Sequence, residues 1–340
     1  MKRNHNLNEN QFFRTWKGVV LQGCLLAVVM WLGLRYGSAV MTISEFWGAF
    51  FRLEGYETSS LILYSVRLPR VLAGVLAGIG LSVSGVLLQS ITDNGLAGPN
   101  IIGVNAGAGF AVVLLLSFFP MAAVQILPFG AFLGAFLATI VIMALAGGIG
   151  SSKSTLILAG VAMTALLNAG ISFMTLLDAD VLTSYNAFSV GGLQGITLSE
   201  LAVPLMIISL SFIIGMGFSR RIEVLCLGDC AATALGIGVK GLRVICMVCA
   251  SASAAAVVSF AGLLGFVGLI VPHMARKLVG GKTSFLLPVS AVLGAMLVVL
   301  GDLLGRVLAA PSEIPVGIMM AFVGAPFFMV LLFKRGREFE

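Results

Sequence analysis

The chain has 340 residues, of which 59% are hydrophobic and only 10% are charged, and its mean hydropathy is +1.10. Soluble globular domains carry roughly 25% charged and about 45–50% apolar residues, so this composition excludes a soluble fold, and its hydrophobicity excludes a disordered chain. The net charge of +6 then indicates membrane topology rather than nucleic-acid binding. We expect an all-α, polytopic integral protein of the cell (cytoplasmic) membrane.

Long runs without charged residues define the predicted membrane-spanning helices. Residues 94–152 contain no Asp, Glu, Lys or Arg, which is long enough for two crossings at about 20 residues each. The rest of the chain divides in the same way into a single transmembrane domain over residues 18–333. The ten predicted spans lie near residues 18–36, 65–90, 96–118, 121–146, 155–177, 198–217, 242–261, 263–278, 285–308 and 314–333.

The basic residues give these spans an orientation, because Lys and Arg are concentrated in cytoplasmic loops. With the N-terminus inside, fifteen of the twenty basic residues fall in cytoplasmic segments. An even number of spans places both termini on one side, so the tails at residues 1–17 and 334–340 are predicted to be cytoplasmic. The five basic residues that fall outside are Arg35, Arg52, Arg67, Arg70 and Arg306.

Pairs of glycines four residues apart recur in the predicted spans. Such pairs let two helix backbones approach closely in lipid, where the hydrophobic effect does not drive helix association. We therefore expect a tightly packed helical bundle. The pairs are Gly74/Gly78, Gly103/Gly107, Gly130/Gly134 and Gly301/Gly305.

The sequence offers little chemistry for catalysis. Its two histidines, His5 and His273, belong to no cluster with metal-ligand spacing. Residues 236–241 match G-x-G-x-x-G, but no buried strand precedes them and no βαβ unit is expected, so we predict no nucleotide site. We expect no enzyme activity, no metal site and no cofactor. If ATP drives the protein, another subunit must hydrolyse it.

Asp302 is the one carboxylate deep within a predicted span, and Arg306 follows it by four residues. This spacing corresponds to one helical turn and favours a local ion pair. An ion-coupled secondary transporter is the alternative function for such a chain. That class usually needs several intramembrane ionisable residues that form a relay, and one Asp near a helix end is thin support for such a relay.

Three stretches of the sequence are more specific than its composition. The first is Arg67-Leu-Pro-Arg70, followed by an apolar helix and the Gly-rich segment 92–109. The second is Leu227-Gly-Asp-Cys-Ala-Ala-Thr-Ala-Leu-Gly236. The third begins at Gly265-Phe-Val-Gly-Leu-Ile-Val-Pro-His273 and continues through Asp302 and Arg306 to the segment 313–328, which ends in Gly-Ala-Pro-Phe-Phe.

In this order and spacing, these stretches resemble the FecCD family, the permease subunits of ABC importers for ferric siderophores, haem and vitamin B12. The resemblance implies a ten-helix permease that translocates an iron-siderophore-type chelate, or haem or cobalamin. It also implies a second permease copy, in a homodimer or a heterodimer. Two cytoplasmic ABC ATPase subunits and an extracytoplasmic substrate-binding protein would complete the importer.

The resemblance further implies roles for particular residues. Arg67, Arg70 and Arg306 match positions where arginines dock glutamates of the binding protein, and the planar guanidinium suits such pairing. The alternative is that these arginines lie at the membrane interface or pair with Asp302.

Two segments on the cytoplasmic side complete the expected machinery. The segment at about 219–241 is expected to form two short helices that contact the ATPase, the alternative being an ordinary loop. Residues 152–154 align with the cytoplasmic gate, although a plain polar turn is an equal alternative. The residues concerned are Leu227, Gly228, Asp229, Ala232, Leu235 and Gly236 for the ATPase contact, and Ser152, Lys153 and Ser154 for the gate.

Overall fold

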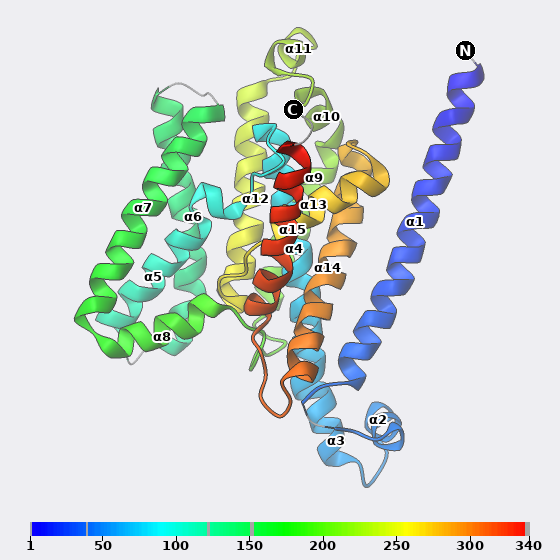
Figure 1. Cartoon of the computed structure of the whole chain (residues 1–340), viewed down its shortest axis with the longest axis vertical. Coiled ribbons are helices and arrows are strands. Elements are labelled where there is room, and N and C mark those ends of the chain that lie inside the picture. The colour runs from blue at the N-terminus through cyan, green and yellow to red at the C-terminus, as the bar shows by residue number, and fades with distance from the viewer. Residues whose placement is uncertain (1, 39, 121–122, 150–152, 337–340) are drawn as a thin grey trace.

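The computed structural model describes residues 2–38, 40–120, 123–149 and 153–336, and within these ranges it contains helices and no strand (Figure 1). This confirms the predicted all-α class. A helix at each of the ten predicted spans accounts for most of the chain. These helices are α1 (Lys2–Arg35), α4 (Leu68–Thr92), α5 (Val104–Phe118), α6 (Ala123–Ile149), α7 (Lys153–Leu177), α9 (Ala202–Gly217), α12 (Val239–Ala261), α13 (Val267–Val279), α14 (Thr283–Leu308) and α15 (Val316–Gly336).

Length and apolar composition support most of these helices as membrane spans. Among the described residues, five helical segments are long and apolar enough to cross a membrane alone, and a bent pair of helices at 202–225 makes a sixth. Three shorter apolar helices lie at 20–35, 104–118 and 316–331. Together with the 13-residue α13, they account for the ten predicted spans.

Seven short elements join the spans, and several have clear local causes. Thr42 and Glu45 form a reciprocal capping box that starts one of them, and Asp178 caps another by accepting hydrogen bonds from the backbone of Asp180 and Val181. The short elements are α2 (Ile43–Phe50), α3 (Glu57–Leu61), the π-helical turn η1 (Ile62–Arg67), the 3-10 turn η2 (Pro99–Ile102), α8 (Ala179–Val190), α10 (Ser219–Leu225) and α11 (Asp229–Ala234).

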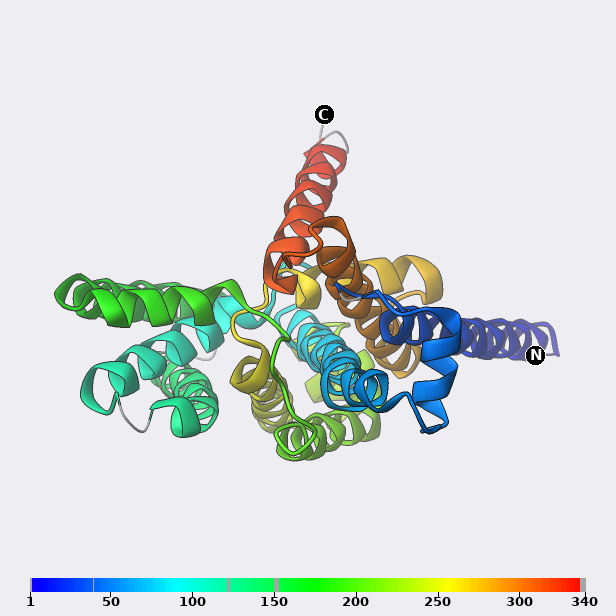
Figure 2. The same cartoon turned by 90° about the horizontal axis from the view of Figure 1, so that it is seen from below.

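Helix α4 forms the centre of the bundle, and Figure 2 shows it between α14 and α12. Its glycines make this packing possible. A Cβ on Gly78 would collide with the carbonyl oxygen of Gly294 on α14, and a Cβ on Gly85 would collide with that of Gly268 on α13. On the neighbouring pair α5 and α6, Gly107 and Gly134 face each other's backbone in the same way. The close helix packing expected from the glycine pairs is therefore confirmed.

The bundle has two distinct ends, which we name by the short helices that they carry. At the α11 end lie α10, α11, the start of α1 and the last turns of α15 (Figure 1). At the opposite α2 end lie α2, α3 and α8 (Figure 1). The first and last described residues are thus on one side of the bundle, as an even number of spans requires. Helix α1 begins at Lys2, so the predicted N-terminal tail continues the helix of the first span.

Candidate functional site

A buried cluster of charged side chains lies near the α2 end, where α4, α14 and the 309–315 connection meet. On α4, Arg70 donates hydrogen bonds from Nε to both carboxylate oxygens of Asp302, at 3.0 and 3.1 Å. Its Nη2 lies 2.9 Å from Asp302 Oδ1, and its Nη1 donates to Glu313 Oε2 at 2.6 Å. Asp302 also pairs with Arg306, whose Nε lies 3.0 Å from Asp302 Oδ2. The local ion pair predicted from the four-residue spacing is confirmed.

Glu313 connects four segments of the chain. Its carboxylate accepts hydrogen bonds from Ser38 at 2.7 Å, from Arg70 at 2.6 Å and from Gln194 at 2.7 Å. Partial burial acts to raise the pKa of the Glu313 carboxyl, but these hydrogen bonds and the charge of Arg70 lower it below its ordinary value of 4.5. Glu313 is therefore a charged tie between the α1–α2 connection, α4, the segment after α8 and the 309–315 connection.

The structure brings the three arginines of the predicted docking site together, but it buries their side chains. Arg67, Arg70 and Arg306 are 3%, 6% and 2% exposed. Arg67 Nη1 donates to the backbone carbonyls of Leu34 and Arg35 at 2.9 and 2.7 Å, and Arg306 Nη1 donates to those of Gly33 and Tyr36. In this conformation the guanidinium groups hold α1, α4 and α14 together. The docking role itself stays a prediction.

The segment expected to contact the ATPase contains two short helices, α10 and α11, at the α11 end (Figure 1). Helix α10 bends away from α9 by 62°. Gly228 and Gly236, at the two ends of α11, have φ values of +107° and +78°, which glycine adopts without strain. Two glycine turns therefore set α11 apart from the spans on either side.

The predicted contact residues do not all lie on the surface of this segment. Leu227 and Leu235 are 72% and 66% exposed. Ala232 is completely buried, because its side of α11 packs on the bundle. The free apolar surface therefore comes from the two leucines that flank α11.

An ion pair ties α11 to the first turns of α12. Asp229 Oδ1 lies 2.7 Å from Arg243 Nη2, and this arginine donates a hydrogen bond to it. The two residues are separated by fourteen positions and by the turn at Gly236, so no helical periodicity predicts the pair. Any movement of α11 would act on α12 through this contact.

The predicted gate residues lie where α6 is followed by α7. Ser152 lies outside the described residues. Lys153 is the first residue of α7, and Ser154 is exposed in its first turn. The start of α7 lies at the same end of the bundle as α11 (Figure 1). Within the described ranges, no group of three or more His, Cys, Asp or Glu side chains is placed to hold a metal ion.

Comparison with known families agrees with this architecture. The model of the FecCD transport family matches residues 25–334. The chain belongs to the FecCD transport family. The family match spans nine of the ten predicted helices completely, and it includes the arginine cluster, α10, α11 and the segment before α7.

Several curated FecCD relatives are similar over most of their length. The chain is 37% identical over 322 residues to the iron(3+)-hydroxamate import system permease protein FhuG of Bacillus subtilis, covering 91% of this chain and 94% of FhuG. It is 38% identical to the Fe(3+) dicitrate transport system permease protein FecD of Escherichia coli, and the match covers 80% of this chain and 85% of FecD. It is 36% identical to the cobalamin import system permease protein BtuC of Halobacterium salinarum, and the match covers 83% of this chain and 75% of BtuC.

The structure of this chain is also similar to a solved structure. That solved structure is described as an inward-facing conformation of a metal-chelate type ABC transporter. The TM-score is 0.82 at 29% identity, and the match covers 94% of this chain and 99% of the other. The FecCD resemblance, the multi-pass membrane architecture and the helical fold inferred from the sequence are thus confirmed.

Proposed function

We propose that this chain is the membrane-spanning permease subunit of an ATP-driven importer and that its cargo is a ferric chelate of the siderophore type. One observation carries the proposal, namely the similarity to FhuG over nearly the full length of both chains. The similarity to FecD supports an iron chelate as well. Haem and cobalamin are the other cargoes compatible with the family, and the similarity to BtuC supports the latter.

In this proposal the chain does not hydrolyse ATP, and two ABC ATPase subunits bind at the α11 end. The exposed Leu227 and Leu235 support this contact, since exposed apolar side chains beside a short, separately placed helix suit insertion into a groove of a partner. The α11 end is then cytoplasmic, as are both termini. Ser152, Lys153 and Ser154, at the point in the sequence where α7 begins, would form the cytoplasmic gate.

The substrate-binding protein docks at the α2 end in this proposal. Arg67, Arg70 and Arg306 lie in the charged cluster there, and Asp302 and Glu313 pair with two of these arginines. The positive charge of these arginines attracts acidic residues of a partner over the distance of the Debye length. A carboxylate of the binding protein would then share the arginines with Asp302 and Glu313.

A second permease copy completes the pathway. Helix α7 supports this assignment, because only 11% of its apolar window is buried within the chain. Its large exposed side chains include Leu158, Val161, Leu166 and Phe173. Either a second copy of this chain or a related permease would cover this face, giving a homodimer or a heterodimer.

Co-purification from membranes tests the proposal. A tagged chain should bring down an ATPase, and uptake of radiolabelled ferric hydroxamate into vesicles should stop when vanadate blocks ATP hydrolysis. Transport that continues with vanadate but collapses when the ion gradients are dissipated would instead identify an ion-coupled secondary transporter. Asp302 gives that alternative little support, because both Arg70 and Arg306 already neutralise it.

A further inference from the structure

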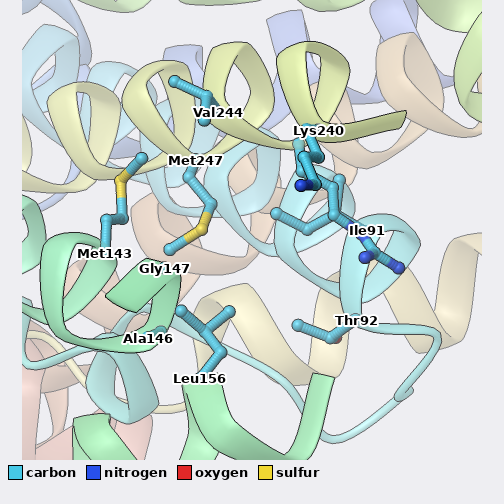
Figure 3. A pocket seen from close by; sticks show the side chains of 10 residues that line it. Ile91, Thr92, Met143, Ala146, Gly147, Leu156, Lys240, Val244 and Met247 are labelled. Atoms are coloured by element: carbon cyan, nitrogen blue, oxygen red, sulfur yellow. The ribbon is translucent and has the colours of Figure 1, made fainter. Parts of the chain in front are cut away.

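A cavity of about 230 Å³ opens at the α11 end between four helices (Figure 3). Figure 3 shows Met143, Met247 and Leu156 pointing into this space from α6, α12 and α7. The lining residues are Ile91, Thr92, Met143, Ala146, Gly147, Leu156, Lys240, Arg243, Val244 and Met247.

The walls of this cavity are apolar, but two basic residues stand together at its rim. Lys240 and Arg243 are three positions apart on α12, so they lie on one face of the helix. Asp229 neutralises one of the two charges through Arg243 Nη2. Lys240 makes no ion pair within the described ranges, and Arg243 Nε is buried there without a hydrogen-bond partner. The rim therefore has one uncompensated positive charge and an unused N–H donor.

The occupant must satisfy both parts of the cavity. A small inorganic anion would meet the rim but leave the apolar walls empty, and a neutral hydrocarbon would leave the buried Arg243 Nε unpaired. Val244 lines the cavity and is half exposed, so the space opens along the outer surface of α12. An amphiphile with an anionic head and an alkyl chain fits this arrangement, because basic pockets between spans on the cytoplasmic side bind acidic lipid headgroups.

We propose that this cavity is a binding site for an acidic phospholipid of the inner leaflet. The phosphate lies between Lys240 and Arg243, and part of one acyl chain lies against Met143, Leu156 and Met247. The assignment to the inner leaflet rests on the orientation proposed above. Because Arg243 also holds Asp229, the bound phosphate shares a side chain with the ion pair that fixes α11.

Binding to the purified full chain in detergent tests the site without any ATPase or transport. The readouts are native mass spectrometry of bound lipid and the melting temperature during titration with dioleoyl phosphatidylglycerol or dioleoyl phosphatidylcholine. The wild type should bind the anionic lipid preferentially. Lys240→Gln, which keeps the Arg243–Asp229 pair, should weaken its binding about fivefold, and Lys240→Gln/Arg243→Gln about 30-fold.

A second variant tests the apolar part of the site with all charges intact. Gly147 lines the cavity and a Cβ on it would meet no atom within 4 Å, so Gly147→Leu adds an apolar side chain at the cavity wall. It should reduce phosphatidylglycerol binding at least tenfold. The matched control is Lys277→Gln/Lys282→Gln, which removes two exposed lysines of the α13–α14 region and should bind like the wild type.

Three results would overturn the proposal. In the first, the wild type binds phosphatidylglycerol and phosphatidylcholine equally. In the second, the Lys277→Gln/Lys282→Gln control loses as much phosphatidylglycerol binding as the Lys240→Gln/Arg243→Gln variant. In the third, inorganic phosphate raises the melting temperature as much as phosphatidylglycerol does. None of these results depends on cargo or ATP, so failure of the lipid site and failure of the importer proposal are separate outcomes.

Discussion

Asp302 on α14 accepts two hydrogen bonds from Arg70 on α4, 232 positions earlier in the chain, and also pairs with Arg306 one turn further along its own helix. This carboxylate is 2% exposed. The charges of the buried Arg70 and Arg306 are therefore compensated by Asp302 and Glu313. Burial of such a group is tolerated only while its partners remain in place.

Removal of the Asp302 charge should destabilise the chain strongly. Asp302→Asn keeps the shape of the side chain but leaves Arg70 and Arg306 with one carboxylate between them. Breaking a buried pair from one side costs about 3–5 kcal/mol, so we expect a large drop in melting temperature in detergent. Asp180→Asn, at an exposed carboxylate on α8, is the control. Equal melting temperatures for the two variants would contradict the structural role of Asp302.

Glu313 should make stability depend on pH in the acid range. Its folded pKa lies below the ordinary value of 4.5, so its contribution is complete above that value and is lost as the pH falls through the folded pKa. At pH 7, Glu313→Gln should lower the unfolding free energy by about 2 kcal/mol, because charge-assisted hydrogen bonds are lost. The difference from the wild type should shrink once the pH is below 4.5.

The control for Glu313 is Glu54→Gln, since Glu54 is an exposed acid at the same end of the bundle. Unfolding followed by tryptophan fluorescence from pH 3 to 8 is the measurement. A difference between Glu313→Gln and the wild type that stays constant across this range would show that the carboxylate charge does not matter. A stability difference between Glu313→Gln and the wild type that grows as the pH falls would show the same.

The spans were predictable from the sequence because lipid imposes a strong and local requirement. Each crossing needs a long apolar run, and such runs can be read without knowledge of neighbouring helices. The glycine pairs likewise indicated close packing. Short helices such as α2 and α8 were missed, because they depend on single capping residues, Thr42 and Asp178, and not on hydrophobic periodicity.

The charged cluster was only partly predictable. The Asp302–Arg306 pair lies within one helical turn and could be inferred from spacing. Its extension to Arg70 and Glu313 requires α4, α14 and the 309–315 connection to meet, which no local pattern shows. The sequence favoured docking for Arg67 and Arg70 and left pairing with Asp302 as the alternative. In the structure Arg70 does pair with Asp302, and Arg67 donates to backbone carbonyls. The pairing of Asp229 with Arg243 escaped prediction on similar grounds.

Helix packing around α4 should be sensitive to a single methyl group. A Cβ on Gly78 would collide with the backbone of Gly294, and backbone atoms cannot rotate away as a side chain can. Gly78→Ala should therefore cost about 1–3 kcal/mol of stability, measured as lost monodispersity and a lower melting temperature. Gly147→Ala, where the added methyl group meets open space, should leave both unchanged. Equal stability of the two variants would exclude close packing at Gly78.

Charge on the exposed surface of α11 should separate the permease from its ATPase. Leu235→Arg places a cation where an apolar groove is proposed to receive Leu235, so desolvation of the new charge opposes binding. Co-purification of the ATPase should fall at least tenfold while the melting temperature of the permease stays near that of the wild type. Gly281→Arg adds the same charge in the α13–α14 connection, where a Cβ meets no other atom. It should retain the ATPase, and normal ATPase recovery with Leu235→Arg would remove Leu235 from the interface.

Substitution of Arg67 should affect docking of the binding protein at the α2 end more than it affects folding. Arg67 donates hydrogen bonds to the backbone carbonyls of Leu34 and Arg35, so Arg67→Gln keeps a donor there while it removes one positive charge from the cluster. We expect slower association of the binding protein, by about 3- to 10-fold at low ionic strength, with the difference shrinking as salt screens the charge. Surface plasmon resonance on nanodisc-embedded permease measures this rate. Arg52→Gln, at an exposed arginine of the same end, is the matched control. Equal association rates for Arg67→Gln and the wild type at low salt would limit Arg67 to holding α1 against α4.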